Sequence, residues 1–340
     1  MGKVVTFGEI MLRLAPNGYY RLFQNNQLQA TFGGAEANVA VSLANYGVDT
    51  EFVTKVPDNA IGRSAVCELR KFGVDTSGIV YGGNRLGIYF LEKGASQRGS
   101  VCIYDRSHSS IQEADSGDFN WDDIFEGAEW FHFSGITPAL GPELVKACLE
   151  ACKEAKKLGV TVSCDLNYRS KLWSREDARA AMSELCRYVD VCIANEEDAK
   201  DVFGIVAEDT DIEGGKLNVD GYKSVAKQLK DKFDFKYVAF TLRTSISASD
   251  NDWAAMLYDG TEFCLSRKYS LRIVDRVGGG DSFSAGLIYS LIKEKDSQFA
   301  IEFATAASAL KHSIEGDFNR VSLDEVEKLV GGNGSGRVQR

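Results

Sequence analysis

The sequence predicts an α/β protein in which a mostly parallel sheet lies between two layers of helices. Short apolar segments rich in β-branched residues alternate with longer amphipathic segments along most of the chain. Several of the longer segments stop at a glycine, which is typical of a helix C-terminus. Strands that alternate with helices in this way usually pair in parallel, with helices on both faces.

The predicted elements follow in the order strand, helix, strand. The first part of the chain supplies a strand over 4–8, a helix over 35–46 before Gly47, a strand over 51–56 and a helix over 61–72 before Gly73. The middle supplies a strand over 129–134, a helix over 142–158 before Gly159, and strands over 160–166, 189–194 and 237–242. The last predicted helix covers 282–291 and follows three glycines.

Two stretches break this alternation. Segments 10–14 with 29–32, and 86–92 with 101–104, have the pattern of strands without intervening helices. They lie within about 10–32 and 85–106 and predict a small additional sheet. The sequence shows no internal repeat and no domain boundary, so we expect one domain over 1–330. The glycine-rich residues 331–340 predict a disordered tail.

The composition is that of a globular protein and excludes some functions. The 340 residues are 44% hydrophobic and 26% charged, with a net charge of −10. An acidic surface argues against a nucleic-acid partner, so anionic substrates would have to bind local arginines and backbone donors. No apolar run is long enough to cross a membrane, and the N-terminus enters a strand without a signal-peptide pattern.

The eight cysteines include no C-x-x-C pair, and only three histidines accompany them. This pattern does not predict a Cys/His metal site. We expect reduced cysteines that pack as small hydrophobic residues in a cytoplasmic protein. His108, His132 and His312 are expected to be structural rather than catalytic.

The most informative segment runs from Ile273 to Gly286. A β-branched strand end leads into Gly278, Gly279 and Gly280, and Asp281 follows at once. Glycine backbone N–H groups at a helix N-terminus can surround an anion, and an adjacent carboxylate can take a proton from a hydroxyl. Phosphoryl transfer from a nucleotide to an alcohol needs this arrangement. Taken alone, the spacing is equally explained by a flexible loop with an acid in the first helical turn.

The segment resembles the C-terminal signature D-T-x-G-A-G-D-x-F-x-x-G of the ribokinase-like (PfkB) carbohydrate kinases. The matching positions are Asp275, Gly278, Gly280, Asp281, Phe283 and Gly286. The chain departs from it at Gly279, where the backbone donors are kept, and at Arg276, where threonine is usual. The second departure leaves open any monovalent-cation site that would use the threonine. The resemblance implies a three-layer ribokinase-like fold, ATP and Mg²⁺ as cofactors, and a β-sheet lid that pairs with a second subunit.

A second element lies near the N-terminus, where Gly33 and Gly34 lead into a helix that carries Asn38. A tight turn before a polar helical turn explains these residues without a ligand. The same family has a G-G-x-x-x-N-V-A element here, and the resemblance implies that Gly34 and Asn38 hold sugar hydroxyls.

Two arginines lie beside tyrosines in segments that follow predicted strands. Tyr89, Tyr104 and Arg106 come from the additional sheet, and Arg169 follows the strand over 160–166. A single arginine is commonly a surface cation with a packed stem. Two arginines beside aromatic hydroxyls instead suggest a clamp for a carboxylate, which guanidinium matches in a planar fork.

Over nearly its full length the chain is similar to the 2-keto-3-deoxygluconate kinases. Shared segments are 8–14, Tyr104-Asp105-Arg106, Asn167-Tyr168-Arg169 and 316–319. This resemblance implies that the sugar acid is contacted by Gly34, Asn38, Tyr89, Tyr104, Arg106, Arg169, Asp281 and Asp317.

The nucleotide side carries less familiar residues. Asn195-Glu196-Glu197-Asp198 resembles the family's N-x-x-E element, which implies a water-mediated Mg²⁺ contact at Asp198, although a simple helix cap also explains it. Arg243 stands where the family's T-x-G-x-x-G loop has its first glycine. Either Arg243 contacts a phosphate or the nucleotide lies differently. The residues expected to bind ATP are Asn167, Asn195, Thr241, Arg243, Gly278 and Gly280.

The function expected from the sequence is ATP-dependent phosphorylation of 2-keto-3-deoxygluconate to its 6-phosphate. Asp281 would be the general base, and the backbone of 278–281 would be the anion hole. A kinase of a neutral ketose such as fructose and a non-catalytic sugar-acid sensor are the alternatives, and the C4 epimer is not excluded as substrate. A nicotinamide dehydrogenase is disfavoured because no G-x-G-x-x-G follows the first strand.

Overall fold

A long twisted sheet forms the centre of the molecule. The computed structural model of the chain describes residues 2–195, 197–206 and 219–334. The strands of this sheet are β1 (Lys3–Phe7), β4 (Thr50–Val56), β5 (Ile79–Tyr81), β8 (Ala128–Ser134), β9 (Thr161–Asp165), β10 (Val191–Ala194), β11 (Tyr237–Ser245), β12 (Asp250–Tyr258), β13 (Phe263–Leu265) and β14 (Tyr269–Arg272). Their spatial order is β13-β12-β11-β10-β9-β8-β1-β4-β5, with β14 also beside β12.

Pairing in this sheet is parallel from β5 to β11 and antiparallel around β12. The mostly parallel sheet predicted from the alternation is therefore confirmed. The strand predicted over 237–242 continues to Ser245 and forms a hairpin with β12, which the sequence analysis did not predict.

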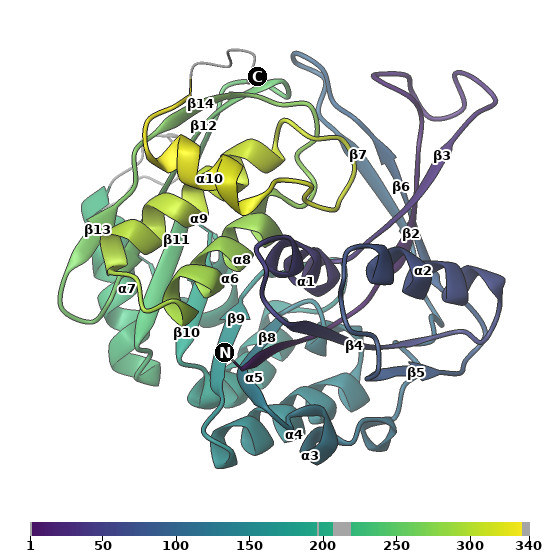
Figure 1. Cartoon of the computed structure of the whole chain (residues 1–340), viewed down its shortest axis with the longest axis horizontal. Coiled ribbons are helices and arrows are strands. Elements are labelled where there is room, and N and C mark those ends of the chain that lie inside the picture. Colours follow the sequence, from purple (N-terminus) through teal and green to yellow (C-terminus); the bar gives the residue numbers. More distant parts are fainter. Residues whose placement is uncertain (1, 196, 207–218, 335–340) are drawn as a thin grey trace.

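Helices cover both faces of the sheet (Figure 1). One layer holds α1 (Ala35–Asn45), α2 (Ala60–Lys71), α8 (Gly279–Ile292), α9 (Ser297–Lys311) and α10 (Leu323–Val330). The other holds α3 (Trp121–Ile124), α4 (Pro142–Lys157), α5 (Arg175–Leu185), α6 (Asp198–Phe203) and α7 (Val219–Phe233). Short 3₁₀ turns are η1 (Ser116–Asp118), η2 (Pro138–Leu140) and η3 (Cys186–Tyr188).

The two apolar layers follow from the alternation of side chains along each strand. In β1, Val4 packs with α1 and α8, whereas its neighbour Val5 packs in the layer that contains α4. In β8, Trp130 and Phe131 divide in the same way. Successive residues of a strand point to opposite faces, so apolar runs in the central strands fill both layers.

A second, smaller sheet projects from one end of the molecule. Its strands are β2 (Met11–Ala15), β3 (Gln29–Gly33), β6 (Gly87–Glu92) and β7 (Val101–Asp105), in the order β3-β2-β6-β7. Figure 1 shows it at the upper right, extending away from the central layers. This confirms the small separate sheet predicted from the two strand-like stretches, and we call it the lid sheet.

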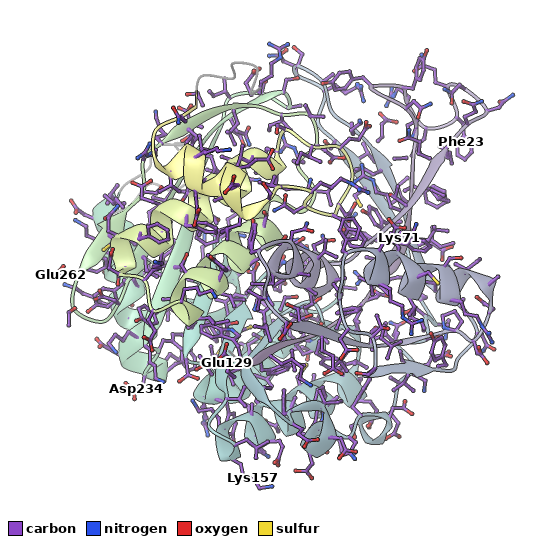
Figure 2. The ribbon with its side chains drawn as sticks, in the orientation of Figure 1. Phe23, Lys71, Glu129, Lys157, Asp234 and Glu262 are labelled. Carbon is purple, nitrogen blue, oxygen red and sulfur yellow. The ribbon has the colours of Figure 1, made fainter. Side chains whose placement is uncertain are left out.

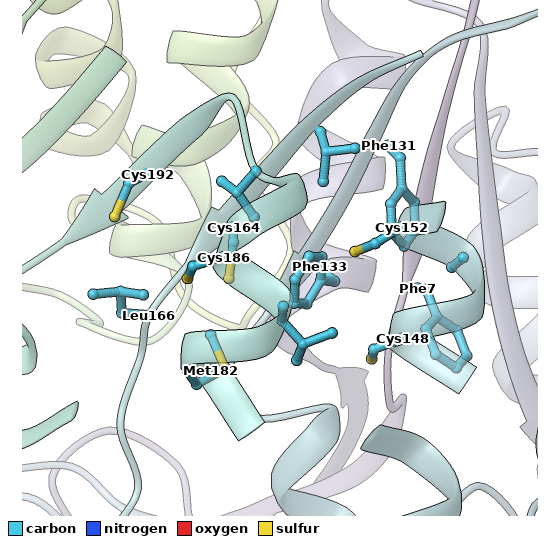
Figure 3. Packing of buried hydrophobic residues seen from close by; sticks show 14 of the residues in the cluster. Phe7, Phe131, Phe133, Cys148, Cys152, Cys164, Leu166, Met182, Cys186 and Cys192 are labelled. Atoms are coloured by element: carbon cyan, nitrogen blue, oxygen red, sulfur yellow. The ribbon is translucent and has the colours of Figure 1, made fainter. Parts of the chain in front are cut away.

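Five of the cysteines lie in the core between the sheet and α4 and α5. Cys148, Cys152, Cys164, Cys186 and Cys192 are buried and free, and Figure 3 shows them among Phe131, Phe133 and Met182. Burial raises the pKa of each of these thiols. They pack as small hydrophobic groups, as predicted, whereas Cys67 is exposed and Cys102 and Cys264 are partly exposed.

Two predicted boundaries change in the structure. The helix predicted over 282–291 begins at Gly279, because Gly279 and Gly280 adopt helical backbone angles behind Gly278, which is left-handed with φ of 82°. Residues 331–333 of the predicted tail donate backbone hydrogen bonds to carbonyls of α10 and so close that helix. Residues 335–340 of the predicted tail lie outside the described residues. Among the described helices, none has the length and apolar character needed to cross a membrane.

Candidate active site

One cavity collects most of the residues that the sequence analysis selected. It has a volume of about 520 Å³ and lies between the lid sheet, the N-terminus of α8 and the carboxyl ends of β9, β10 and β11. The predicted site residues that line it are Gly34, Asn38, Tyr89, Tyr104, Arg106, Asn167, Arg169, Asn195, Asp198, Thr241, Arg243, Gly278, Gly280, Asp281 and Asp317. This is the position expected for a ligand site in an open α/β sheet.

The N-terminus of α8 presents backbone donors to the cavity. Gly278 is the N-cap, and Gly279, Gly280 and Asp281 form the first helical turn. The first N–H groups of a helix have no intrahelical acceptor, and the helix dipole adds positive potential there. Gly279 differs from its neighbours, because its N–H points at Arg276 O (3.4 Å) and its Cα packs on the His312 ring. Gly279 is therefore the one predicted site residue that does not line the cavity.

Asp281 lies at the junction of the backbone donors and the cavity. Its Oδ2 accepts a hydrogen bond of 2.6 Å from the amide of Asn38, which enters from α1. Burial raises the pKa of Asp281 to about 7, while the Asn38 bond lowers it, and Asp317 and Glu36 raise it further. A carboxylate with a pKa near neutrality is a strong enough base to accept a proton, and a large fraction of it is ionised at neutral pH.

Glu9 holds one of the two arginines. Arg106 donates to Glu9 Oε2 through Nε (2.8 Å) and also through Nη2, and Ser109 donates to the other oxygen of Glu9 at 2.9 Å. The guanidinium also lies over the ring of Tyr104, 5.3 Å from its centroid. Glu9 is buried and was not among the predicted site residues. Glu9 lies within the shared segment 8–14, but no local sequence pattern indicates that it pairs with Arg106.

A buried ion network links the lid sheet to the loops around α8. Arg13 of β2 donates to Asp317 (2.7 Å) and Asp275 (2.5 Å), and the Tyr89 hydroxyl lies 2.6 Å from both oxygens of Asp317. Asp275 in turn accepts the N–H of Val277 at 3.1 Å. Asp317 therefore orients Tyr89 at the cavity wall. Arg13 was not among the predicted site residues, because its position in a strand does not reveal partners more than 200 residues away.

Arg169 has a different environment from Arg106. It is exposed and lines the cavity beyond the end of β9. Its positive charge opposes the rise in the pKa of Asp281 and of Asp165, which line the same cavity. Arg169 is therefore fully available to a substrate anion, whereas Arg106 is only partly available because Glu9 binds part of its guanidinium.

Acidic groups gather where a nucleotide phosphate and its metal would be expected. Burial, with repulsion from Asp198 and Asp281, raises the pKa of Asp165 well above its ordinary value. Asp198 accepts backbone N–H bonds from Tyr168 and Asn195, each 3.0 Å long. Within the part of the chain that the structure describes, no group of three or more side chains forms a ready metal site. Glu196 of the N-E-E-D segment lies outside the described residues.

The hairpin of β11 and β12 forms the other wall. Its register places Arg243 opposite Trp253, and both line the cavity with Thr241 and Asn251. Arg276 bridges to the turn of this hairpin through a 3.0 Å bond to the carbonyl of Ala248. Burial and the nearby Arg243 lower the pKa of Arg276. Both arginines that replace usual family residues thus lie on one side of the cavity.

Comparison with known proteins identifies the family. The profile of the pfkB family carbohydrate kinases matches residues 1–319. The chain belongs to this family. A pfkB-family fold accounts for the three layers, the separate lid sheet and the cavity between them, and the predicted family and fold are confirmed.

Relatives in the pfkB family cover almost the whole chain. A 2-dehydro-3-deoxygluconokinase of Thermotoga maritima has 53% identity and a TM-score of 0.94, over 97% of this chain and 98% of that one. A pfkB family carbohydrate kinase of Listeria grayi has 37% identity and a TM-score of 0.90, over 97% and 99%. A 2-dehydro-3-deoxygalactonokinase of Haloferax volcanii is 34% identical over 98% of both chains. The chain is a sugar kinase, as predicted.

Proposed function

We propose that this sugar kinase transfers the γ-phosphoryl group of ATP to the terminal hydroxyl of 2-keto-3-deoxygluconate, also called 2-dehydro-3-deoxygluconate, giving the 6-phosphate. The observation that carries the proposal is Asp281, a carboxylate of raised pKa between helix N-terminal donors and an arginine-lined cavity. Relatives that are named 2-dehydro-3-deoxygluconokinase and 2-dehydro-3-deoxygalactonokinase support the choice of substrate.

Asp281 is the general base of the proposed reaction. The proton of the terminal hydroxyl passes to its carboxylate as the oxygen–phosphorus bond forms, and the bond between the β- and γ-phosphates breaks with its electron pair leaving on ADP. The Asn38 amide, 2.6 Å from Oδ2, fixes the carboxylate so that its second oxygen can face the hydroxyl. A positioned base of this kind contributes about 10²–10⁴ in rate.

The N–H groups at the start of α8 stabilise the charge on the transferring group. Gly278 takes the left-handed conformation that turns the chain into the helix, and the N–H groups of Gly280 and Asp281 have no carbonyl of an earlier helical turn to bond. Donors fixed before the reaction starts need no reorganisation as negative charge develops. The N–H of Gly279, which points at Arg276 O, serves to hold the turn instead.

The sugar acid is oriented by the opposite wall. Arg169 is assigned to the carboxylate because it is an exposed cation at the cavity. Arg106 presents the part of its guanidinium that Glu9 leaves unused, and Tyr89 and Tyr104 supply hydroxyls from the lid sheet. Gly34 and Asn38 then face the remaining hydroxyls, and Asp317 acts through Tyr89.

ATP would lie along the β10 and β11 side, between Asn167, Asn195, Thr241 and Arg243. Mg²⁺ commonly keeps most of its waters and binds phosphates with one or two carboxylates, so a prebuilt cage is not required. Asp165 and Asp198 are the carboxylates that fit, and both oxygens of Asp198 already accept backbone N–H bonds, which favours contact through water. When bound, the metal would offset negative charge on the phosphates.

The lid sheet is proposed to pair with a second copy of the chain. Leu14, Ile88, Phe90 and Ile103 alternate with the cavity-facing residues of β2, β6 and β7, so they share the outer face of the sheet. Figure 2 shows Phe23, 76% exposed, at the tip of the loop beyond β2. An exposed apolar sheet face usually marks an interface. The free cysteines also favour the reducing cytoplasm as its location.

A substrate panel tests the function. ADP release is measured with MgATP and 2-keto-3-deoxygluconate, 2-keto-3-deoxygalactonate, fructose or ribose. We expect kcat/KM for the keto acids to exceed that for the neutral sugars by about a hundredfold, since a charged hydrogen bond is worth about 1.5–3 kcal/mol. Preference for fructose would contradict the carboxylate clamp, and the ratio between the two keto acids measures epimer choice.

Replacing Arg169 tests the clamp itself. In Arg169→Met, KM for the keto acid is expected to rise about ten- to a hundredfold, from the same 1.5–3 kcal/mol, with little change for fructose. Arg187→Met is the matched control, because Arg187 is exposed and outside the cavity wall. Equal loss with acid and neutral sugars would show that Arg169 has only a structural role.

A further inference from the structure

Lys311 is a fully buried cation that the proposed reaction does not use. It is the last residue of α9 and has 0% exposure. Its Nζ donates to the backbone carbonyls of Gly316 (2.8 Å) and Ile314 (3.2 Å). Lysine is almost never buried completely unless its charge is compensated.

The ammonium lies directly behind the backbone donors of α8. A Cβ on Gly278 would come within 3.0 Å of Lys311 Cε, so the lysine packs against the residue that caps the helix. The loop after α9 is fastened in the same place. Asp275 accepts the N–H of Gly316 at 3.2 Å while Lys311 binds the carbonyl of Gly316, so both sides of one residue are held.

Two buried carboxylates near Lys311, those of Asp275 and Asp317, share a single arginine. Arg13 binds both Asp275 and Asp317, which leaves one of these two negative charges uncompensated by Arg13. Burial lowers the pKa of Lys311, whereas Asp275 and Asp317 raise it by favouring the charged form. Without the ammonium, a net negative charge would lie behind a site that has to bind a strongly anionic phosphate chain.

Carbonyl oxygens of this kind are also the ligands that proteins offer to K⁺. Here Ile314 and Gly316 give their carbonyls to an ammonium that is tethered to the chain. A monovalent ion at these carbonyls would have to displace Lys311 from a closed environment. The residues present therefore do not fit a separate monovalent cation behind the anion hole.

We propose that Lys311 is a built-in monovalent cation, which fixes the anion-hole loop and supplies the positive charge behind it, so that catalysis needs no added K⁺. The inference rests on the proposed phosphoryl transfer. Lys311 touches no reacting atom and is a positioning residue. It acts through Gly278 and the loop 312–317.

The first experiment uses the unmodified protein. Initial rates with saturating MgATP and sugar are measured in K⁺, Na⁺ and tetramethylammonium buffers of equal ionic strength. We expect the same rate in all three, because the charge is covalently attached. Strong activation by K⁺ over tetramethylammonium would overturn the proposal, and this arm does not depend on any variant folding.

The second experiment removes the ammonium. Lys311→Met removes the ammonium and keeps a long, unbranched side chain. In this variant kcat is expected to fall roughly tenfold or more, while KM for the sugar changes little. This loss is smaller than the about 10²–10³ in kcat that follows removal of a donor in direct contact with the reacting group. In Lys311→Ala, NH₄⁺, methylammonium or K⁺ should restore part of kcat by binding the vacated carbonyls. A lysine that only caps the helix would give no such rescue.

Lys230→Ala is the matched control. Lys230 also donates to a backbone carbonyl, that of Phe235 at 3.0 Å, but it lies on α7, in the opposite helix layer from α8 and α9. Its loss should leave kcat and the cation response unchanged. Loss of kcat in Lys311→Ala without rescue by any of the three cations would contradict the proposal.

Thermal unfolding separates this proposal from the proposed function. A ligand that binds only the folded state raises Tm, so K⁺ or NH₄⁺ should raise Tm of Lys311→Ala and not of the unmodified protein. This readout needs no substrate. A selective Tm rise with an inactive sugar panel would retain the cation site and reject the substrate, whereas equal Tm shifts in both proteins would reject the cation site.

Discussion

At the scale of single residues, the environment decides what each charged group can do. Asp281 and Asp317 both have a raised pKa, but Asp317 is buried and paired with Arg13 and Tyr89, whereas Asp281 is partly exposed, accepts a bond from an amide and faces the cavity. Asp317 is thereby fixed as a support and Asp281 is left able to accept a proton. The two arginines differ in the same way, since Glu9 holds Arg106 and Arg169 is exposed.

The pKa of Asp281 predicts the pH dependence of the rate. A base works only when ionised, so kcat/KM for the sugar should rise with pH and level off above about 7. The bond from Asn38 lowers this pKa, so Asn38→Ala should move the midpoint to higher pH. The measurement is initial rate against pH in both proteins. A flat profile from about pH 5 to 8 would exclude Asp281 as the base.

The same shift predicts a gain in stability when the charge is removed. Because the folded-state pKa is raised above the ordinary value of 3.8, ionising Asp281 costs folding free energy that is absent at low pH, grows between about 4 and 7, and is complete above that. Asp281→Asn should therefore raise Tm at about pH 8 and not at about pH 4, while kcat falls about 10²–10⁴.

Measurement of Tm against pH checks this prediction, with the exposed Asp58 as control. Asp58→Asn should show no comparable pH-dependent gain, since Asp58 lies at the surface in an exposed ion pair with Arg63. A gain of equal size at both pH values in Asp281→Asn would contradict a cost of ionisation.

At the scale of elements, close packing of α8 against α9 holds the catalytic helix. α8 is buried on nearly every side, and a Cβ on Gly286 would come within 2.8 Å of the Cα of Ala304. Glycine at 286 lets the two backbones approach and so sets the height of Asp281 and the backbone donors above the sheet.

Gly286→Ala is expected to force the helices apart and to lower the free energy of unfolding by about 1–3 kcal/mol, the usual cost of overpacking a core. Gly99→Ala is the control, because nothing lies within 4 Å of a Cβ at Gly99. Urea unfolding measures both variants. If Gly286→Ala unfolds at the same urea concentration as the unmodified protein, the helices are not held in contact by this glycine.

At the scale of the whole molecule, the lid sheet is tied to the central layers by ion pairs. Arg13 of β2 reaches the buried Asp275 and Asp317, and Lys93, directly after β6, pairs with the exposed Glu315. The inner face of the lid sheet is thereby fixed over the cavity. Its outer face carries Leu14, Phe90 and Ile103 and is the surface assigned to a second subunit.

Ile103→Asp tests this assignment, since Ile103 is 50% exposed on the outer face. A charge buried at an apolar interface is costly, so if the proposed dimer forms in the unmodified protein, the variant should sediment as a monomer at the same concentration. Tyr81→Asp, an exposed apolar residue on β5, should leave the dimer intact. If the unmodified protein itself sediments as a monomer, the lid interface is rejected.

Much of the fold could be predicted from local sequence patterns. Glycines after 35–46, 61–72 and 142–158 marked the ends of α1, α2 and α4, and apolar runs marked the parallel strands. The strand β12 was missed because its nine residues mix polar and apolar positions without a clean period, and its partner β11 looked complete at Leu242. The start of α8 was placed three residues late because glycine has a low helix propensity, whereas in the folded protein Gly279 packs against His312 as part of the first helical turn.

By itself the sequence determined the fold class through local periodicity and the family motifs through short runs of defined spacing. The resemblance that these motifs carry then implied many of the residues that meet at the cavity. Only the tertiary structure decided which charge each of them faces. The pairing of Glu9 with Arg106, the sharing of Arg13 by Asp275 and Asp317, and the closed environment of Lys311 join residues from distant parts of the chain. Such contacts leave no local pattern, since they arise from the way the sheet brings its loops together.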